Sequence, residues 1–272
     1  MTPTTFTRRA ILLAISLLGI CLPGTAAGAA TSAKLNGTFV PERLGERTTL
    51  DFAFSFSDPG TSVPPPLTQV ELSYPNYLGI GLSGLGLATC TAPVLEAGGP
   101  TACPPNSIMG YGETLTGIIL GETTIHENAP ITILRTPDAE GHFSLLFYAE
   151  GTTPVDTRIL FPGLLLPASA PFGGKVSIGV PLVPTLPGAP DISVLELHAT
   201  LGPHRVLYSE QTNGKTLRYR PTGILLPPRC PPSGFPFAAQ FSFADGTTAT
   251  AFTAVPCPAR AARRGRASKR RG

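Results

Sequence analysis

Hydrophobic and polar residues alternate with a period of two along much of the chain between residues 31 and 258, which is the pattern of half-buried β-strands. In the N-terminal half the pattern is clearest at 48–57, where one side of the predicted strand carries Leu50, Phe52, Phe54 and Phe56. The same period predicts further strands at 33–40, 68–74, 108–119, 130–136, 142–150, 155–161, 175–182 and 191–201. Within the first of these, Asn36-Gly37 is expected to form a turn or a bulge.

Two segments have the pattern of complete β-hairpins. In 230–257, one side of the first arm carries Phe235, Phe237, Ala239, Phe241 and Phe243. Asp245-Gly246 supplies a two-residue turn, and 247–255 is the return arm. With that turn Cys257 lies opposite Gly234, so 231–234 must fold back before Cys257 can reach Cys230. The second hairpin has Asn213-Gly214 between arms at 205–210 and 215–220.

The regular spacing of strands and turns predicts the fold class. No stretch of a dozen residues shows a helical period, so we expect an all-β protein, an immunoglobulin-like or related antiparallel β-sandwich with a C-terminal disulfide-closed hairpin. Residues 31–258 are long enough for one large domain or two small ones. The segment 75–107 lacks periodicity and is predicted to be a long connection that needs a tether or a function.

The N-terminus predicts export. Residues 1–30 contain Arg8-Arg9, an apolar run at 10–22 and the small residues Ala27-Gly28-Ala29, as in a cleaved signal peptide. The general secretory and twin-arginine routes both remain open. The rest of the chain has no second long apolar segment, so no transmembrane segment is expected in the mature protein, which we predict to be secreted or extracellular and cell-wall-associated.

Four cysteines remain after cleavage, and an even number in an exported protein predicts two disulfides. Proximity in the sequence favours Cys90 with Cys103 and Cys230 with Cys257. On the chain-entropy model, a bridge across the second pair stabilises by roughly 3 to 4 kcal/mol. A four-thiolate zinc site is the alternative, but the short Cys-x-x-Cys pairs that such sites use are absent.

Charge is concentrated at the C-terminus. The tail at 259–272 holds seven of the 20 basic residues and none of the 17 acidic ones: Arg260, Arg263, Arg264, Arg266, Lys269, Arg270 and Arg271. Such a block is predicted to be disordered and to bind polyanions, with an anionic cell-wall polymer or membrane surface as the partner. Sequence-specific nucleic-acid binding is not expected, because the body is acidic and has no recognition helix.

No residue pattern predicts catalysis, a cofactor or a metal. Ser83 lies in Gly-Leu-Ser-Gly, which is not the Gly-x-Ser-x-Gly of a nucleophile elbow. The four histidines, His126, His142, His198 and His204, form no metal-binding pattern. Four carboxylates lie on predicted strands, as they do in almost every β-protein: Asp51, Glu71, Glu150 and Glu196.

Turn formers and cysteines carry one resemblance. The matching positions are Cys90, Gly98-Gly99-Pro100, Cys103-Pro104, Ser107, Gly110, the run PTLPGAPD at 184–191, Cys230-Pro231, Gly234-Phe235, Phe241, Phe243, Asp245-Gly246-Thr247 and Val255-Pro256-Cys257. In these residues, from about 75 to 258, the chain resembles a group of uncharacterised exported β-rich proteins of high-GC Gram-positive bacteria. The resemblance implies secretion and a β-rich fold, and it carries over no catalytic residue.

Together these patterns favour a non-enzymatic secreted or cell-envelope-associated structural or binding protein. The alternative is a carbohydrate- or small-ligand-binding lectin-like domain with its site on 75–107, although Tyr77 is the only aromatic residue there.

Overall fold

The computed structural model describes residues 31–40, 42–80, 84–153, 156–184 and 190–258. The predicted signal peptide at 1–30 and the predicted basic tail at 259–272 lie outside the described residues.

Among the described residues, 13 strands form one sheet in which every paired neighbour is antiparallel. They are β1 (Ser32–Val40), β2 (Arg47–Ser57), β3 (Leu67–Pro75), β4 (Gly79–Ile80), β5 (Ile108–Leu120), β6 (Thr123–Ala139), β7 (His142–Gly151), β8 (Thr157–Leu166), β9 (Phe172–Gly179), β10 (Ser193–Leu201), β13 (Ile224–Leu225), β14 (Phe235–Phe243) and β15 (Thr248–Val255). Their order is β15-β14-β3-β9-β8-β7-β6-β5-β10-β2-β13-β4, and β1 also pairs with β2. The predicted all-β antiparallel fold is confirmed.

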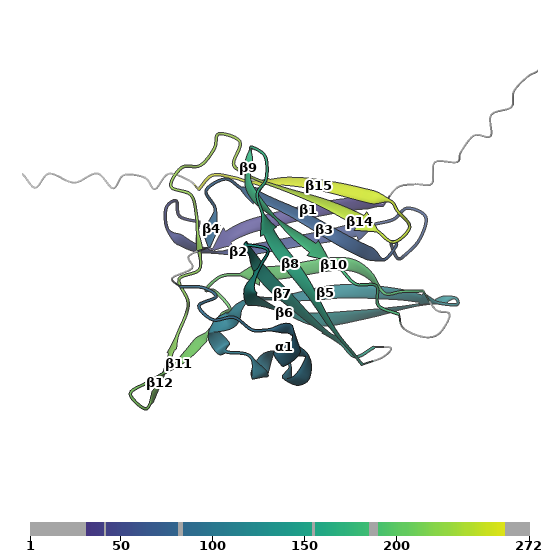
Figure 1. Cartoon of the computed structure of the whole chain (residues 1–272). Helices are drawn as coiled ribbons and strands as arrows, with labels where there is room; N and C mark the ends of the chain where they lie inside the picture. Colours follow the sequence, from purple (N-terminus) through teal and green to yellow (C-terminus); the bar gives the residue numbers. More distant parts are fainter. Residues whose placement is uncertain (1–30, 41, 81–83, 154–155, 185–189, 259–272) are drawn as a thin grey trace, which may run out of the picture.

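The sheet folds over on itself. Figure 1 shows β1, β3, β14 and β15 in one layer and β5, β6 and β7 in the other, with β8 and β9 running steeply between the layers. Strand β1 also packs beside β15, with which the sheet order begins. The inward faces of the two layers therefore enclose a common core.

The side chains of β14 form the centre of this core. Phe235, Phe237, Ala239, Phe241 and Phe243 are all buried, as the alternating pattern predicted. Their rings meet rings from the first two strands: the Phe39 and Phe235 centroids lie 5.5 Å apart, those of Phe54 and Phe241 4.9 Å and those of Phe56 and Phe241 4.8 Å. These contacts join residues far apart in the sequence, so the first two strands pack against a strand from the C-terminal part of the described chain.

The C-terminal hairpin has a longer turn than predicted. Ser242 pairs with Thr248, and the Phe243 amide donates to the Thr247 carbonyl at 3.0 Å. The loop therefore contains three residues. Gly246 lies in the left-handed region at φ 83°, as expected for a three-residue hairpin loop, in which a left-handed residue follows a type I turn. The predicted two-residue Asp245-Gly246 turn is wrong by one residue.

The ends of the hairpin are joined as the cysteine spacing predicted. Cys230 and Cys257 form a disulfide with their Cα atoms 5.7 Å apart. The chain folds back before β14 through a turn in which the Gly234 amide donates to the Pro231 carbonyl at 2.9 Å. The predicted disulfide-closed hairpin is confirmed.

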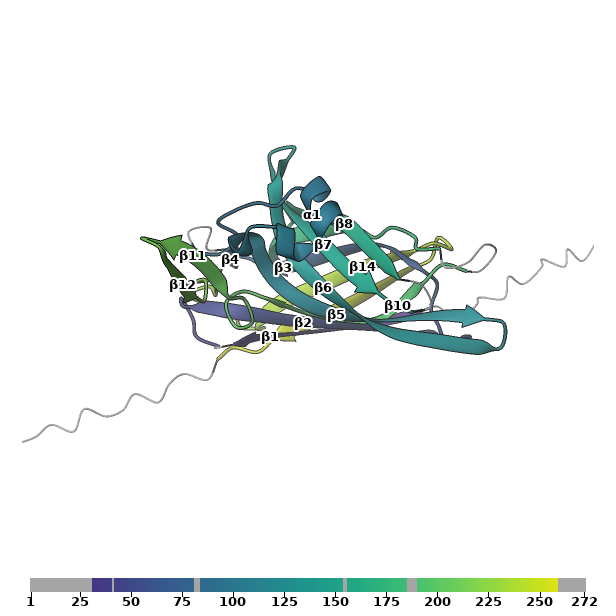
Figure 2. The ribbon, with the colours of Figure 1, turned by 90° about the horizontal axis from the view of Figure 1, so that it is seen from below.

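The other predicted hairpin is also present. Strands β11 (Tyr208–Thr212) and β12 (Lys215–Tyr219) form a separate two-stranded sheet around Asn213-Gly214, and Figures 1 and 2 show it projecting from the main sheet. By contrast, Asn36-Gly37 is not the predicted turn or bulge. Both residues continue β1, and Gly37 pairs with Phe52 of β2.

The described part of the segment 75–107, residues 75–80 and 84–107, forms a structured excursion over the outer face of the sheet. It contains a helix that the search for helical periods missed, α1 (Ala92–Gly98), and two 3₁₀ turns at Pro100–Ala102 and Pro105–Ser107. The predicted Cys90–Cys103 disulfide is present, and it packs with Leu95 on Leu134, Leu146 and Tyr148 of the sheet. At seven residues α1 is too short to show a period of 3.6, and it is held by this contact.

No helix in the described part of the chain has the length and hydrophobicity to cross a membrane.

Two glycines test the geometry of the C-terminal hairpin. Gly234 and Gly246 have φ values of 82° and 83°, but a Cβ on Gly234 would lie 2.4 Å from the Val255 carbonyl oxygen, whereas one on Gly246 would meet nothing within 4 Å. We expect Gly246→Ala to lower the free energy of unfolding by about 1 kcal/mol through backbone strain. Gly234→Ala adds a steric clash and is expected to lower it by about 3 kcal/mol. Urea unfolding of the two variants measures the difference, and equal losses would contradict this turn geometry.

Candidate functional site

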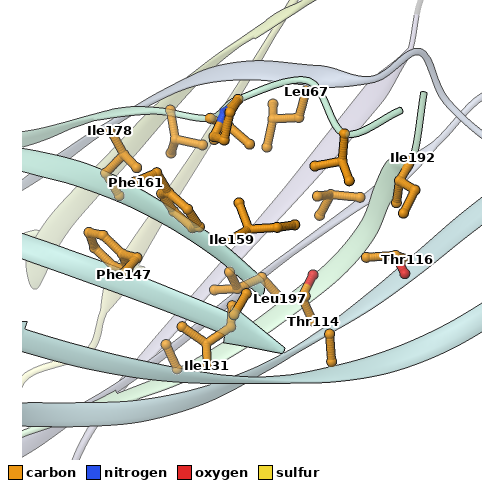
Figure 3. A pocket seen from close by; sticks show the side chains of 18 of the residues that line it. Leu67, Thr114, Thr116, Ile131, Phe147, Ile159, Phe161, Ile178, Ile192 and Leu197 are labelled. Atoms are coloured by element: carbon orange, nitrogen blue, oxygen red, sulfur yellow. The ribbon is translucent and has the colours of Figure 1, made fainter. Parts of the chain in front are cut away.

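The core enclosed by the sheet contains apolar cavities. A cavity of about 110 Å³, called cavity 1 here, lies between the two layers. Figure 3 shows it from close by, with the rings of Phe147 and Phe161 at one side and Thr114, Thr116 and Ile192 at the other. The apolar side chains that line it include Phe52, Phe54, Leu67, Val70, Leu72, Ile131, Ile133, Phe147, Ile159, Phe161, Ile178, Val180, Val194 and Leu197.

Small residues at inward positions create this space. Four alanines line cavity 1, one each on β6, β7, β10 and β14: Ala129, Ala149, Ala199 and Ala239. At the corresponding position of a filled core a larger side chain would reach the opposite layer, since protein interiors leave few voids larger than a water molecule. Inward and outward residues thus keep alternating along these strands, but the alanines leave the space between the two layers unfilled.

The few polar groups of cavity 1 lie on three strands. They are Thr114 and Thr116 of β5, Glu127 of β6 and Thr157 of β8. The hydroxyl of Thr114 donates to the Glu196 carbonyl at 2.9 Å, and that of Thr116 donates to the Glu127 carbonyl at 3.3 Å. Because each proton is used by the backbone, both hydroxyl oxygens remain able to accept a hydrogen bond.

The carboxylate of Glu127 organises the turn after β7. Its Oε1 accepts hydrogen bonds from the Thr152 amide, from the Thr152 hydroxyl at 3.0 Å and from the Thr153 amide at 2.8 Å. Its Oε2 lies 2.9 Å from the point where Gly151 would carry a Cβ, so a larger residue at 151 would force the carboxylate to shift. Glu127 therefore connects the lining of cavity 1 to the chain at its rim.

A second apolar cavity of about 260 Å³, called cavity 2, adjoins the first. Leu72 lines both cavities. The other lining residues of cavity 2 are Leu50, Tyr74, Leu78, Gly79, Leu85, Met109, Phe143, Leu145, Leu165, Val176, Leu201, Ile224 and Phe237. The segment 75–107 thus contributes to the interior through Leu78, Gly79 and Leu85.

Tyr208 holds part of that segment in place. Its hydroxyl accepts a hydrogen bond from the Gly86 amide and donates to the Ile108 carbonyl at 3.2 Å. Burial raises the pKa of Tyr208 to about 12, so the hydroxyl keeps its proton at neutral pH. The neighbouring Leu85 is fully buried against the core.

The carboxylates considered as catalytic candidates are engaged in pairs on the opposite face of the sheet. Asp51 accepts a hydrogen bond from Thr200 at 2.6 Å, and Glu71 lies 2.7 Å from the Lys175 ammonium. Glu150 accepts from the Tyr148 hydroxyl at 2.8 Å, and Glu196 lies 2.6 Å from His198. None of the four lines cavity 1 or cavity 2.

The four histidines also lie apart from the cavities. His126, His198 and His204 are exposed and His142 is half-buried, and within the described ranges no group of three His, Cys, Asp or Glu side chains is placed to hold a metal ion. Ser83 and the tail cations from Arg260 to Arg271 lie outside the described residues.

The cavities were not predicted from the sequence. Their signal was present in the alternation, because Ala129, Ala149, Ala199 and Ala239 occupy core positions of their strands. An alanine on a single strand says little, since the opposite layer can fill the space it leaves. Only the pairing of distant strands shows that the small residues meet.

Comparison with protein-family models, curated proteins and solved structures finds no match to this chain. The resemblance to exported proteins of high-GC Gram-positive bacteria therefore stays a prediction.

A double-mutant cycle tests the rim of cavity 1. Gly151→Ala is expected to lower the free energy of unfolding by about 1 kcal/mol, because the new Cβ displaces the Glu127 carboxylate from its hydrogen bonds to Thr152 and Thr153. In the Glu127→Ala background the clashing atom is absent, so adding Gly151→Ala is expected to change the free energy by less than about 0.5 kcal/mol. Gly179→Ala on β9, where a Cβ meets nothing within 4 Å, is the control. Additive losses in urea unfolding would contradict the contact.

Proposed function

We propose that this chain is an exported, non-enzymatic binding protein that holds a small apolar molecule between the two layers of its sheet. The observation that carries the proposal is the pair of adjoining apolar cavities in the core. Binding sites for small molecules are typically concave and mostly apolar, with a few polar groups that orient the ligand. Cavity 1 has this composition, with four polar residues among the residues that line it.

The size of the cavities supports the same conclusion. An engineered apolar cavity of about 150 Å³ stays free of water and binds benzene or xenon. Cavity 1 at about 110 Å³ is smaller than that cavity and cavity 2 at about 260 Å³ is larger, so a ligand of cavity 1 that is larger than benzene has to extend from one into the other. Each methylene group of a ligand that leaves water contributes about 0.8 kcal/mol, so an alkyl chain gains affinity from filling them.

Export is supported by the two disulfides, which persist in oxidising compartments. The signal-like residues 1–30 agree with this destination. We propose in addition that the basic tail retains the protein at the cell surface, because seven cations within 13 residues attract anionic polymers and lipids.

A saccharide site on the segment 75–107 has less support. The described part of that segment packs Cys90, Leu95 and Cys103 against the sheet, where they are buried. Tyr77 is 78% exposed, but it is the only aromatic residue there on which a sugar ring could stack.

Uptake of a neutral fluorescent apolar probe, N-phenyl-1-naphthylamine, tests the binding proposal. We expect saturable binding at one site per chain and a rise in the melting temperature with probe concentration, because the ligand stabilises only the folded state. Ala149→Leu places three more heavy atoms in cavity 1 and is expected to weaken binding at least about tenfold.

Ala254→Leu is the matched control, since Ala254 lies on β15 away from both cavities. Circular dichroism verifies that both variants fold. A folded Ala149→Leu variant that binds the probe as tightly as the unchanged protein would show that the probe occupies another place.

Washing intact cells with rising salt tests the tail. A chain that ends at Ala259 lacks the seven cations, so we expect it to leave the cells at lower salt than the full chain. Equal retention of the two chains at every salt concentration would exclude electrostatic tethering by the tail.

A further inference from the structure

We propose that the ligand of cavity 1 is an uncharged alkyl or terpenoid alcohol, with its hydroxyl group at Thr114, Thr116 and Glu127. This inference rests on the proposed function and concerns the chemistry of the ligand's polar end. It follows from which polar groups line the cavity and from how three of the four, Thr114, Thr116 and Glu127, are already hydrogen-bonded.

Three of the four polar residues, Thr114, Thr116 and Glu127, are gathered at one side of cavity 1. Figure 3 shows Thr114 and Thr116 at the side away from Phe147 and Phe161. Thr116 pairs with Glu127 across β5 and β6, so the carboxylate belongs to the same side. A chain-like ligand therefore meets aromatic and aliphatic side chains along its length and oxygen atoms at one end.

These oxygen atoms are acceptors. The protons of the Thr114 and Thr116 hydroxyls are donated to backbone carbonyls, and the Glu127 carboxylate has no proton to give when ionised. A ligand hydroxyl can donate to such a group. An ether oxygen cannot, and would place two acceptors against each other.

A negatively charged end is disfavoured at the same place. Among the described residues that line cavity 1, none is Lys, Arg or His, and the one charged group is Glu127. A fatty-acid carboxylate would lose water without gaining a cation and would be repelled by Glu127.

The basic residues nearest in sequence do not compensate. Arg158 of β8 pairs with Glu150 at 3.8 Å, and side chains alternate along β8, so it points away from the face of Thr157. His126 precedes Glu127 on β6 and lies on the opposite face by the same alternation.

Competition between ligands of equal chain length tests the inference. With the full chain at pH 8 and N-phenyl-1-naphthylamine bound, decan-1-ol, decanoate and decyl methyl ether are titrated as competitors. We expect decan-1-ol to displace the probe at a concentration at least about tenfold lower than decanoate, and at a lower concentration than the ether. Equal potency of the alcohol and decanoate would overturn the inference while leaving the proposed function intact.

The Glu127→Gln variant separates charge from shape. The amide oxygen of Gln can still accept from Thr152 and Thr153, so the turn is expected to stay in place. Decanoate is expected to bind several-fold more tightly to this variant, and decan-1-ol within about twofold of the unchanged protein. No change in decanoate affinity in the folded variant would overturn the role of Glu127.

Two further results bear on the uncharged ligand and on the proposed function separately. Tighter binding of decylammonium than of decan-1-ol would overturn the uncharged ligand in favour of a cation. If the probe itself does not bind the unchanged protein, the proposed function is wrong, and the inference about the ligand's polar end falls with it.

Discussion

The structure depends on the contact between the phenylalanine row of β14 and the rings of β1 and β2. Phe235, Phe241 and Phe243 pack against Phe39, Phe54 and Phe56 with ring centroids 4.8 to 5.5 Å apart. Aromatic pairs of this kind each contribute about 0.5 to 1.5 kcal/mol beyond the area they bury. They hold β1 and β2 against β14 across the core. In the described part of the chain no strand ladder joins β1 to β15, so side-chain packing rather than backbone hydrogen bonding closes this side of the molecule.

The same core is filled in one region and open in another. Near β1 and β2 large rings from both layers interlock, whereas Ala129, Ala149, Ala199 and Ala239 leave cavity 1 between the layers. Empty space of this kind costs stability, because its lining loses dispersion contacts. A fold that keeps it offsets that cost through the interlocked rings and two disulfides. The cavity is thus a candidate for function and not a by-product of poor packing throughout.

Much of the fold was predictable because strand alternation is a local property. The strands at 48–57 and 142–150, the C-terminal hairpin and both disulfides follow from neighbouring residues and short spacings. The turn after Phe243 was missed by one residue, because Asp-Gly suits both two-residue and three-residue loops. Helix α1 was missed because seven residues cannot show a helical period. The alanines alone did not suffice to predict the cavities, since these depend on which strands face each other. The acceptor character of Thr114 and Thr116 depends on carbonyls that only the folded sheet supplies.

The central claim is that the interior between the two layers, and not the surface, receives the ligand. Intermolecular nuclear Overhauser effects from decan-1-ol to assigned methyl groups test it most directly. The account predicts effects at Ile131, Ile159 and Leu197, which line cavity 1, and none at Leu217 on the exposed β11–β12 hairpin. Effects confined to Leu217 and other exposed methyl groups would contradict it.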